Sequence, residues 1–165
     1  MAAPGGDRYD YPGTPQYNTA GNRILSTYPE GVLRANGLLD PAGNPTTTTV
    51  IRNCDEGVCG YYAYLQGTSM ASPHAAGVAA LIVSQYGVDD AARGGLKLRP
   101  AVVGRVLRGT ATDVACPEPR DVRYITGVTP ALNPAYDATC EGGAAFNGFY
   151  GHGLVDAVAA VGGQE

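Results

Sequence analysis

The sequence is poor in lysine, with Lys97 as its single example, and its formal net charge is −4. A protein that binds nucleic acid or an anionic membrane surface needs a basic face. Long apolar runs are also missing, because the longest, Ala75–Val83, is far shorter than the roughly 20 residues that cross a bilayer. The composition therefore argues against nucleic acid and membranes as partners.

The start of the sequence lacks the features of a secretory signal peptide. Met1 is followed by Ala-Ala-Pro-Gly-Gly, without a basic region or an apolar core. We therefore expect any export signal to lie outside this chain. No internal repeat is visible, and 165 residues with 44% apolar content predict one globular domain with its own core, over residues 1–165.

The four cysteines allow three disulfide pairings. Proximity in the sequence favours Cys54–Cys59 and Cys116–Cys140, since each pair closes a short loop. Neither spacing is that of a zinc finger and no histidine lies beside the cysteines, so we expect no metal there. Disulfides indicate an oxidising compartment, and the alternative is buried free thiols.

The clearest local pattern predicts a helix from Thr68 to about Tyr86. Thr68 or Ser69 can cap its start, and Pro73 is tolerated only in the first turn of a helix. Gly87 is a typical C-terminal signal. The segment Ala75–Val83 is apolar on every face, which predicts a helix buried all round, with Gly77 allowing the close approach of another backbone.

Other elements are shorter. Pro100 suits the first position of a second helix that ends at Gly109, and a closing helix is expected within Gly153–Val161. Short strands are expected at Ile24–Tyr28, Thr47–Arg52 and Tyr61–Leu65. Two long loops are expected at about residues 29–60 and 113–147.

Chemistry is indicated by residues 67–77, which read Gly-Thr-Ser-Met-Ala-Ser-Pro-His-Ala-Ala-Gly. The pattern predicts that Ser69 lies on a tight turn at the positive end of a helix. A nucleophilic hydroxyl for acyl transfer is well placed there. The Ser69 backbone N–H is a candidate oxyanion donor. Gly67 removes a side chain that would block a bound peptide. A lone serine before a helix would be weak evidence, because serine is a common helix cap.

The whole run resembles the nucleophile motif of the subtilases, the subtilisin-like serine proteases. Ala3-Pro4-Gly5 resembles the strand end that precedes this motif, and residues 150–157 resemble the family's closing segment. The resemblance implies a three-layer α/β fold with a mostly parallel sheet and peptide-bond hydrolysis. It also implies that Gly67, Thr68 and Met70 contact the substrate, although Met70 is equally suited to core packing.

One departure limits the resemblance. The family triad runs in the order Asp, His, Ser, yet the two histidines, His74 and His152, both follow Ser69. The aspartates before Ser69 also lack the family's Asp-x-Gly context; they are Asp7, Asp10, Asp40 and Asp55. The chain therefore resembles the C-terminal part of a subtilase peptidase domain, without the base, its orienting group or the oxyanion Asn, and should be nearly inactive alone.

Several residues have a plainer interpretation beside the functional one. His74 lies about one and a half helical turns after Ser69, which favours a structural role, and His152 is expected at the surface. Asp7 and Asp10 could bind the calcium that some subtilases hold, but solvated charges are favoured. Aromatic residues in a strand often belong to the hydrophobic core. One tyrosine of the expected strand could therefore either flank a substrate cleft or be buried, and the three candidates are Tyr61, Tyr62 and Tyr64.

Three functions follow from these patterns. The favoured one is a secreted serine endopeptidase, of which this chain is the nucleophile part, with a polypeptide substrate and the missing N-terminal half as partners. The second is a degenerate or split subtilase half that binds without catalysis. The third is an α/β-hydrolase esterase, which fits poorly because the second glycine of Gly-x-Ser-x-Gly is absent, although Asp137 and His152 follow Ser69 in the required order.

Overall fold

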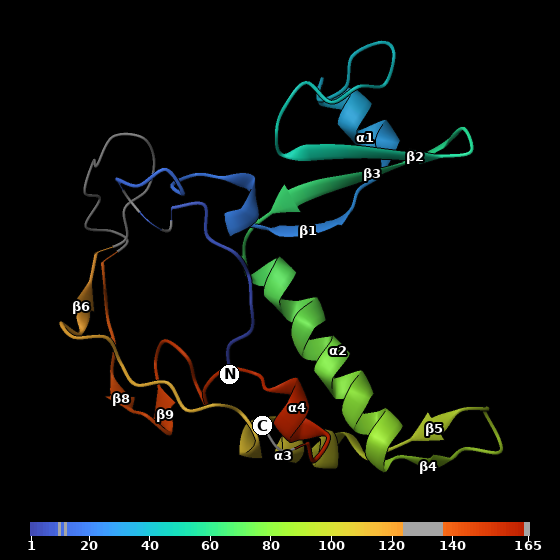
Figure 1. Ribbon diagram of the computed structural model, residues 1–165. Helices are drawn as coiled ribbons and strands as arrows, with labels where there is room; N and C mark the ends of the chain where they lie inside the picture. Colours follow the sequence, from blue (N-terminus) through green and yellow to red (C-terminus); the bar gives the residue numbers. More distant parts are fainter. Residues whose placement is uncertain (10, 12, 124–136, 164–165) are drawn as a thin grey trace. The chain divides into compact units, whose positions relative to one another are not determined.

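The computed structural model describes residues 1–9, 11, 13–123 and 137–163. The chain forms two compact units, one of residues Gly5–Met70 and one of Met1–Pro4 together with Ala71–Glu165. Helix α2, Thr68–Tyr86, crosses the boundary between them (Figure 1). Each unit has a hydrophobic core of its own.

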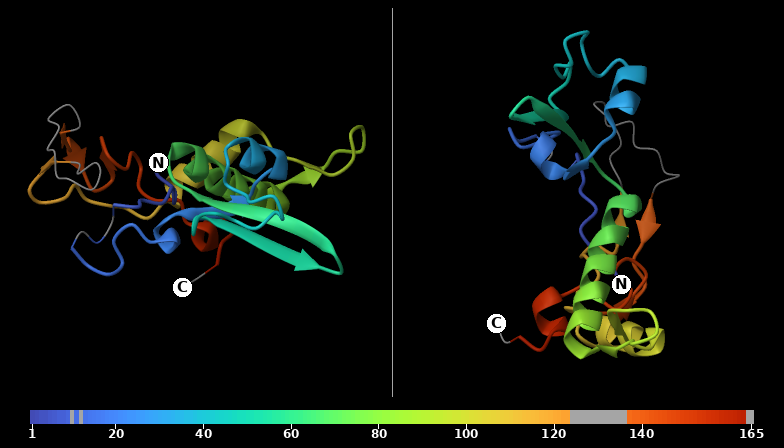
Figure 2. Two further views of the ribbon diagram at one scale, coloured as in Figure 1. Left: turned by 90° about the horizontal axis from the view of Figure 1, so that it is seen from above. Right: turned by 90° about the vertical axis from the view of Figure 1, so that its right-hand side faces the viewer.

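The unit Gly5–Met70 is built on a three-stranded antiparallel sheet in the order β1-β3-β2. Its strands are β1 (Ile24–Thr27), β2 (Val50–Asp55) and β3 (Val58–Leu65). A short 3-10 helix, Ala20–Asn22, precedes β1, and helix α1 (Glu30–Ala35) lies over one face of the sheet (Figure 2). Residues 29–60 are thus not the loop that the sequence indicated, since α1, β2 and the start of β3 lie within them.

The core of this unit consists of Leu33, Leu39, Val50 and Tyr61. Tyr61 is only 6% exposed, and its hydroxyl donates a hydrogen bond to the Gly43 carbonyl at 3.0 Å. This bond satisfies the polar end of an otherwise buried ring. Of the three tyrosines considered for a substrate cleft, Tyr61 is therefore a core residue.

Asp40 organises the turn that carries Gly43. Its carboxylate accepts hydrogen bonds from the Asn44 backbone N–H at 2.7 Å and from the Asn44 side-chain amide at 3.0 Å. These two bonds stabilise the ionised form and hold the pKa of Asp40 below its ordinary value of 3.8. The turn is therefore best formed when Asp40 is charged.

The second core lies between three helices: the part of α2 from Ala71 onward, α3 (Pro100–Gly109) and α4 (Ala157–Ala160). Figure 2 shows α3 and α4 beside the C-terminal end of α2. The buried residues are Val78, Ile82 and Ala160, and the α3 residues Val103, Val106 and Leu107 pack against them. The predicted bounds of α2 and α3 are confirmed, whereas the closing helix is shorter than expected and is capped by Asp156.

Pro73 and Gly87 have distinct roles near the two ends of α2. Pro73 lies inside the helix rather than in its first turn. Proline has no N–H, so Pro73 cannot donate the helical hydrogen bond to the Ser69 carbonyl. At the other end, the Gly87 N–H donates to the Val83 carbonyl at 2.8 Å, and a Cβ at Gly87 would collide with that oxygen. Glycine is thus required where the helix ends.

The expectation that α2 is buried all round is wrong for the described part of the chain. Only Val78 and Ile82 are buried on this helix, while Leu81 is 48% exposed. A Cβ placed on Gly77 would meet no atom within 4 Å, so no described backbone approaches it. The described residues cover one face of an otherwise apolar helix.

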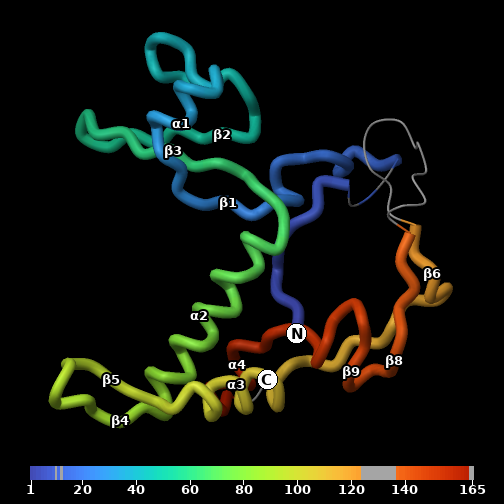
Figure 3. The backbone as a smooth tube through the Cα atoms, turned by 180° about the vertical axis from the view of Figure 1, so that it is seen from behind, coloured from blue at the N-terminus to red at the C-terminus, as the bar shows by residue number. Residues whose placement is uncertain are grey.

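Three further pairs of two-residue strands lie in the described part of the chain, and each pair is antiparallel. β4 (Val88–Asp89) pairs with β5 (Leu96–Lys97), β6 (Asp121–Val122) with β7 (Ala138–Thr139), and β8 (Gly142–Gly143) with β9 (Phe146–Asn147). Figure 3 labels the strands β4, β5, β6, β8 and β9 along the chain trace. Among the described residues the parallel pairing is limited to one bridge, between Ala2 and Leu154.

The mostly parallel sheet implied by the resemblance is therefore not seen, although helices and strands are both present, as in an α/β protein. Antiparallel strands need only a short turn between them, whereas parallel strands need a long crossover connection. The described chain supplies local hairpins, and its one parallel bridge joins residues near its two ends.

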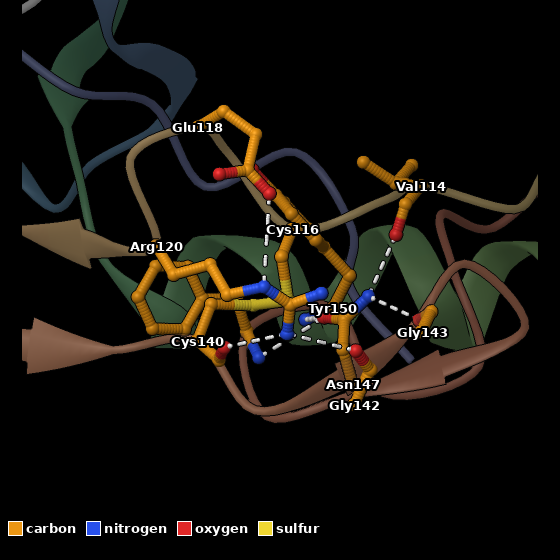
Figure 4. Close-up of a disulfide and its surroundings, with 10 residues drawn as sticks. Val114, Cys116, Glu118, Arg120, Cys140, Gly142, Gly143, Asn147 and Tyr150 are labelled. Atoms are coloured by element: carbon orange, nitrogen blue, oxygen red, sulfur yellow. Dashed lines mark hydrogen bonds and ion pairs between the residues drawn. A yellow bond between two sulfur atoms is a disulfide. The ribbon is translucent and has the colours of Figure 1, made fainter.

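Residues 113–123 and 137–147 are more ordered than the expected loop. The Cys116–Cys140 disulfide joins the two stretches, and Arg120 donates to the Cys140 and Gly142 carbonyls (Figure 4). Asn147 is 1% exposed; its amide donates to the Val114 and Gly143 carbonyls and accepts from two backbone N–H groups. The buried amide is thus fully satisfied.

No helix in the described part of the chain combines the length and the apolar character needed to cross a membrane.

Replacing Ile82 by alanine should lower the free energy of unfolding by about 2–5 kcal/mol, because this side chain is fully buried in the second core. Leu81→Ala is the matched control, since the neighbouring leucine is half exposed and its loss should cost well under half as much. Denaturant unfolding of the chain measures both, and equal losses would contradict the one-sided burial of α2.

The carboxyl of Asp40 should titrate with a midpoint below 3.8, because its partners at Asn44 stabilise the charged form. The stabilisation is present above the unfolded-state pKa and is lost as the pH falls through the lower folded-state value. A carbon-13 NMR titration measures this midpoint. Asn44→Ala should raise the midpoint, whereas the control Asn53→Ala, at an exposed position of β2, should leave it unchanged. A midpoint at or above 3.8 in the unaltered chain would show that Asn44 does not stabilise the charged carboxyl.

Candidate active site

The turn before α2 depends on Gly67. Its φ is +132°, a conformation that glycine adopts far more readily than other residues. The Gly67 N–H donates to the Gly5 carbonyl at 2.9 Å, and the Gly67 carbonyl accepts from the Met70 N–H at 3.0 Å. The turn is thereby fixed on both sides, and α2 begins at the next residue, Thr68.

The segment that contains Gly5 is held against the end of β3 by further bonds. The Arg8 N–H donates to the Gln66 Oε1 atom at 2.8 Å, and the Asp7 N–H donates to the Asn22 carbonyl at 2.8 Å. Two segments far apart in the sequence, Ala3-Pro4-Gly5 and the run from Gly67, therefore meet at Gly5 and Gly67. Sequence reasoning identified both segments but missed Gln66 as a link between them.

Ser69 is the second residue of α2 and is exposed. The first N–H groups of a helix have no partner within the helix and form its positive end, which stabilises negative charge. The Ser69 side chain makes no hydrogen bond to any other described residue. A Cβ on Gly67 would meet no atom within 4 Å, so space is open beside the serine turn.

The neighbours of Ser69 differ in exposure. Thr68 is exposed, like Ser69, whereas Met70 is half-buried. Because Pro73 has no N–H, the Ser69 carbonyl receives no hydrogen bond from the following helical turn. The Ser69 carbonyl is therefore left without its usual partner within the helix.

His74 is not placed to act on the Ser69 hydroxyl along α2. His74 follows Ser69 by five residues, which in a helix is a rise of about 7.5 Å and a rotation of about 140°. His152 lies after α3, is half-buried, and its ring packs edge-on against Phe146 with the centroids 4.9 Å apart. It is thus less exposed than the surface position expected from the sequence.

The acidic candidates have local structural roles. The Asp7 carboxylate accepts from the Tyr9 N–H at 2.8 Å, and Asp137 forms an ion pair with Arg123 at 3.1 Å. Asp10 lies outside the described residues. Within the part of the chain that the structure describes, no group of three or more acidic, cysteine or histidine side chains could hold a metal ion.

Both cysteine pairs form disulfides, with the pairing predicted from proximity. Cys54 and Cys59 are register partners in the β2–β3 hairpin, with their Cα atoms 4.0 Å apart. Cys116 and Cys140 join the two stretches around Asn147, with their Cα atoms 5.7 Å apart. Each disulfide lies within one of the two units.

In a comparison with family models, residues 2–153 match the model described as the subtilase family. The match includes all of the Gly67–Gly77 run and the segment at Ala3-Pro4-Gly5. No significant match is found among curated proteins or among solved structures.

Gly67→Ala should destabilise the chain by about 1–3 kcal/mol, because alanine is strained at a φ of +132° even though its methyl group has room. Gly77→Ala is the matched control: Gly77 lies within α2, a Cβ there has open space, and the substitution should stabilise the chain by about 0.5–1 kcal/mol. Urea unfolding measures both substitutions. A stabilising Gly67→Ala would show that the turn does not need glycine.

Proposed function

The chain belongs to the subtilase family, and on that basis we propose that it carries the nucleophile of a subtilisin-like serine endopeptidase. The nucleophile is Ser69, and the substrate is a polypeptide. The observation that carries the proposal is the exposed Ser69 at the start of α2, directly after a turn that only glycine readily adopts.

The reaction that this serine performs is acyl transfer. Its Oγ atom attacks the scissile carbonyl, its proton passes to a histidine base, and the resulting oxyanion is stabilised by donors that include the Ser69 N–H. The C–N bond then breaks, the leaving amine takes the proton, and water releases the acyl group from Ser69. Gly67 leaves room for the substrate backbone, Thr68 lies beside it, and Met70 lines the leaving-group side.

The base, its orienting carboxylate and the second oxyanion donor come, in this proposal, from a preceding part of a longer protein. Support comes from α2, whose apolar sequence is covered on one face only by the described residues, with Leu81 48% exposed. An apolar helix is stable in water only when most of its surface is covered. The chain alone should therefore be nearly inactive.

Secretion is part of the same proposal. Its support is the presence of two disulfides, each closing a different part of the chain. Disulfides persist mainly in oxidising compartments such as the extracellular space.

The alternative is a subtilase half that binds a peptide or a complementary chain without catalysis. It is favoured by the positions of the two histidines, since His74 points away from Ser69 along α2 and His152 packs against Phe146. The labelling experiment that follows separates this alternative from the peptidase.

A fluorophosphonate probe reacts with an activated serine and should label the full-length protein that carries this chain. Ser69→Ala should abolish the labelling because it removes the attacking oxygen, and residues 1–165 alone should stay unlabelled because the base is absent. Ser72→Ala is the matched control, an exposed serine in the next turn of α2, and should label normally. Equal labelling of Ser69→Ala would remove Ser69 from its role, and no labelling of the unaltered full-length protein favours the non-catalytic alternative.

A further inference from the structure

Positive charge is concentrated in one stretch of this acidic chain. From Ala91 to Thr112 the sequence has five basic side chains and no acidic one, although the chain as a whole carries a net charge of −4. The five are Arg93, Lys97, Arg99, Arg105 and Arg108. The nearest acidic residues in sequence are Asp89, Asp90 and Asp113, so the charge is local and does not contradict the overall composition.

The basic side chains of this stretch are exposed and mostly unpaired. Lys97 forms an ion pair with Asp90 at 3.6 Å. The four arginines are exposed, and none of them forms an ion pair with any of the residues that the structure describes. Their guanidinium groups are therefore available to an anionic partner.

An apolar pocket lies among these charges. It has a volume of about 380 Å³ and is lined by Val88, Leu98 and Val102 together with Lys97 and Arg99. The lining comes from β4, from β5 and the residues that follow it, and from the first turns of α3. Val88 is 61% exposed at its edge. We call this region, with Arg105 and Arg108, the β5–α3 surface.

Helix geometry extends the charge along α3. Arg105 follows Val102 by three residues, so the two side chains are neighbours on the helix surface. Val106, which follows Val102 by four residues, packs in the second core with Val103 and Leu107, so Val102 lies at the edge of the buried face of α3. Arg99 and Arg105 thus precede and follow the half-buried pocket residue Val102 by three residues each.

A partner that fits this surface needs both negative charge and an apolar group. Carboxylates form charge-assisted, often bidentate hydrogen bonds with arginine, while the apolar lining is favourable only for a group that loses contact with water. A sulfated polysaccharide or a nucleic acid backbone supplies negative charge but no compact apolar group. The pocket, in contrast, has space for one aliphatic or aromatic side chain.

We propose that the β5–α3 surface docks an acidic peptide segment, with one apolar side chain in the pocket between Val88, Leu98 and Val102 and with carboxylates at Arg99 and Arg105. The docking site is formed by residues of one unit only and uses neither Ser69 nor the turn at Gly67. It is a separate property from the proposed peptidase activity and does not rest on it.

The test is a fluorescence anisotropy titration of the full-length protein carrying Ser69→Ala, so that no bound peptide is cleaved. The probe is a fluorescein-labelled peptide of aspartate and glutamate residues with one central leucine. Arg99→Gln combined with Arg105→Gln should raise the Kd at least about tenfold, because two charged donors are lost. The control is Arg34→Gln with Arg123→Gln, which removes the same charge from two exposed ion pairs elsewhere and should leave the Kd unchanged.

A second peptide, with serine in place of the leucine, tests the pocket itself and should bind several-fold more weakly. Equal affinity for the two peptides overturns the proposal, because the pocket would then have no part in binding. Equal losses in the two double variants, or binding of heparin with no binding of either peptide, also overturn it. Ser69 is replaced in every protein used for this titration. If the unaltered protein were not labelled by the fluorophosphonate, the proposed peptidase activity would be rejected, but the measured peptide affinities would be unaffected.

Discussion

The candidate site depends on the hydrogen bond from the Gly67 N–H to the Gly5 carbonyl. This bond joins the first residues of one unit to the end of β3 and fixes the turn from which α2 starts. The positive φ of Gly67 allows the chain to make this hydrogen bond and still start α2 at the next residue. The hydrogen bond from the Arg8 N–H to the Gln66 side chain stabilises the same junction. Ser69 is exposed at a defined place because these backbone contacts leave the turn little freedom.

A second constraint is the apolar character of α2. Its face with Val78 and Ile82 packs against α3 and α4, but the rest of the helix lacks cover from the described residues. This pattern is costly in water, and it is the physical reason for our proposal that the chain is part of a larger peptidase rather than an independent module. The exposed arginines of the β5–α3 surface, in contrast, are compatible with solvent and need no covering polypeptide.

Local signals in the sequence predicted much of the structure. The bounds of α2 and α3 follow from Gly87 and Pro100, and the disulfides follow from short loop lengths. The antiparallel sheet was not predicted, because the expected parallel sheet came from the family resemblance and the β1–β3 pairing joins segments far apart in the chain. Nor did the sequence show that Tyr61 is the buried tyrosine, since that depends on its bond to the distant Gly43. The Gly5–Gly67 contact was missed for the same reason.

The central claim is that Ser69 belongs to a peptidase larger than this chain. The most direct test is the intact mass of the native product that contains the Ser69 peptide. The account predicts a mass well above the 16.9 kDa of these 165 residues, with the missing triad residues before Met1. A native product near 16.9 kDa would contradict it and would favour a binding role for the chain.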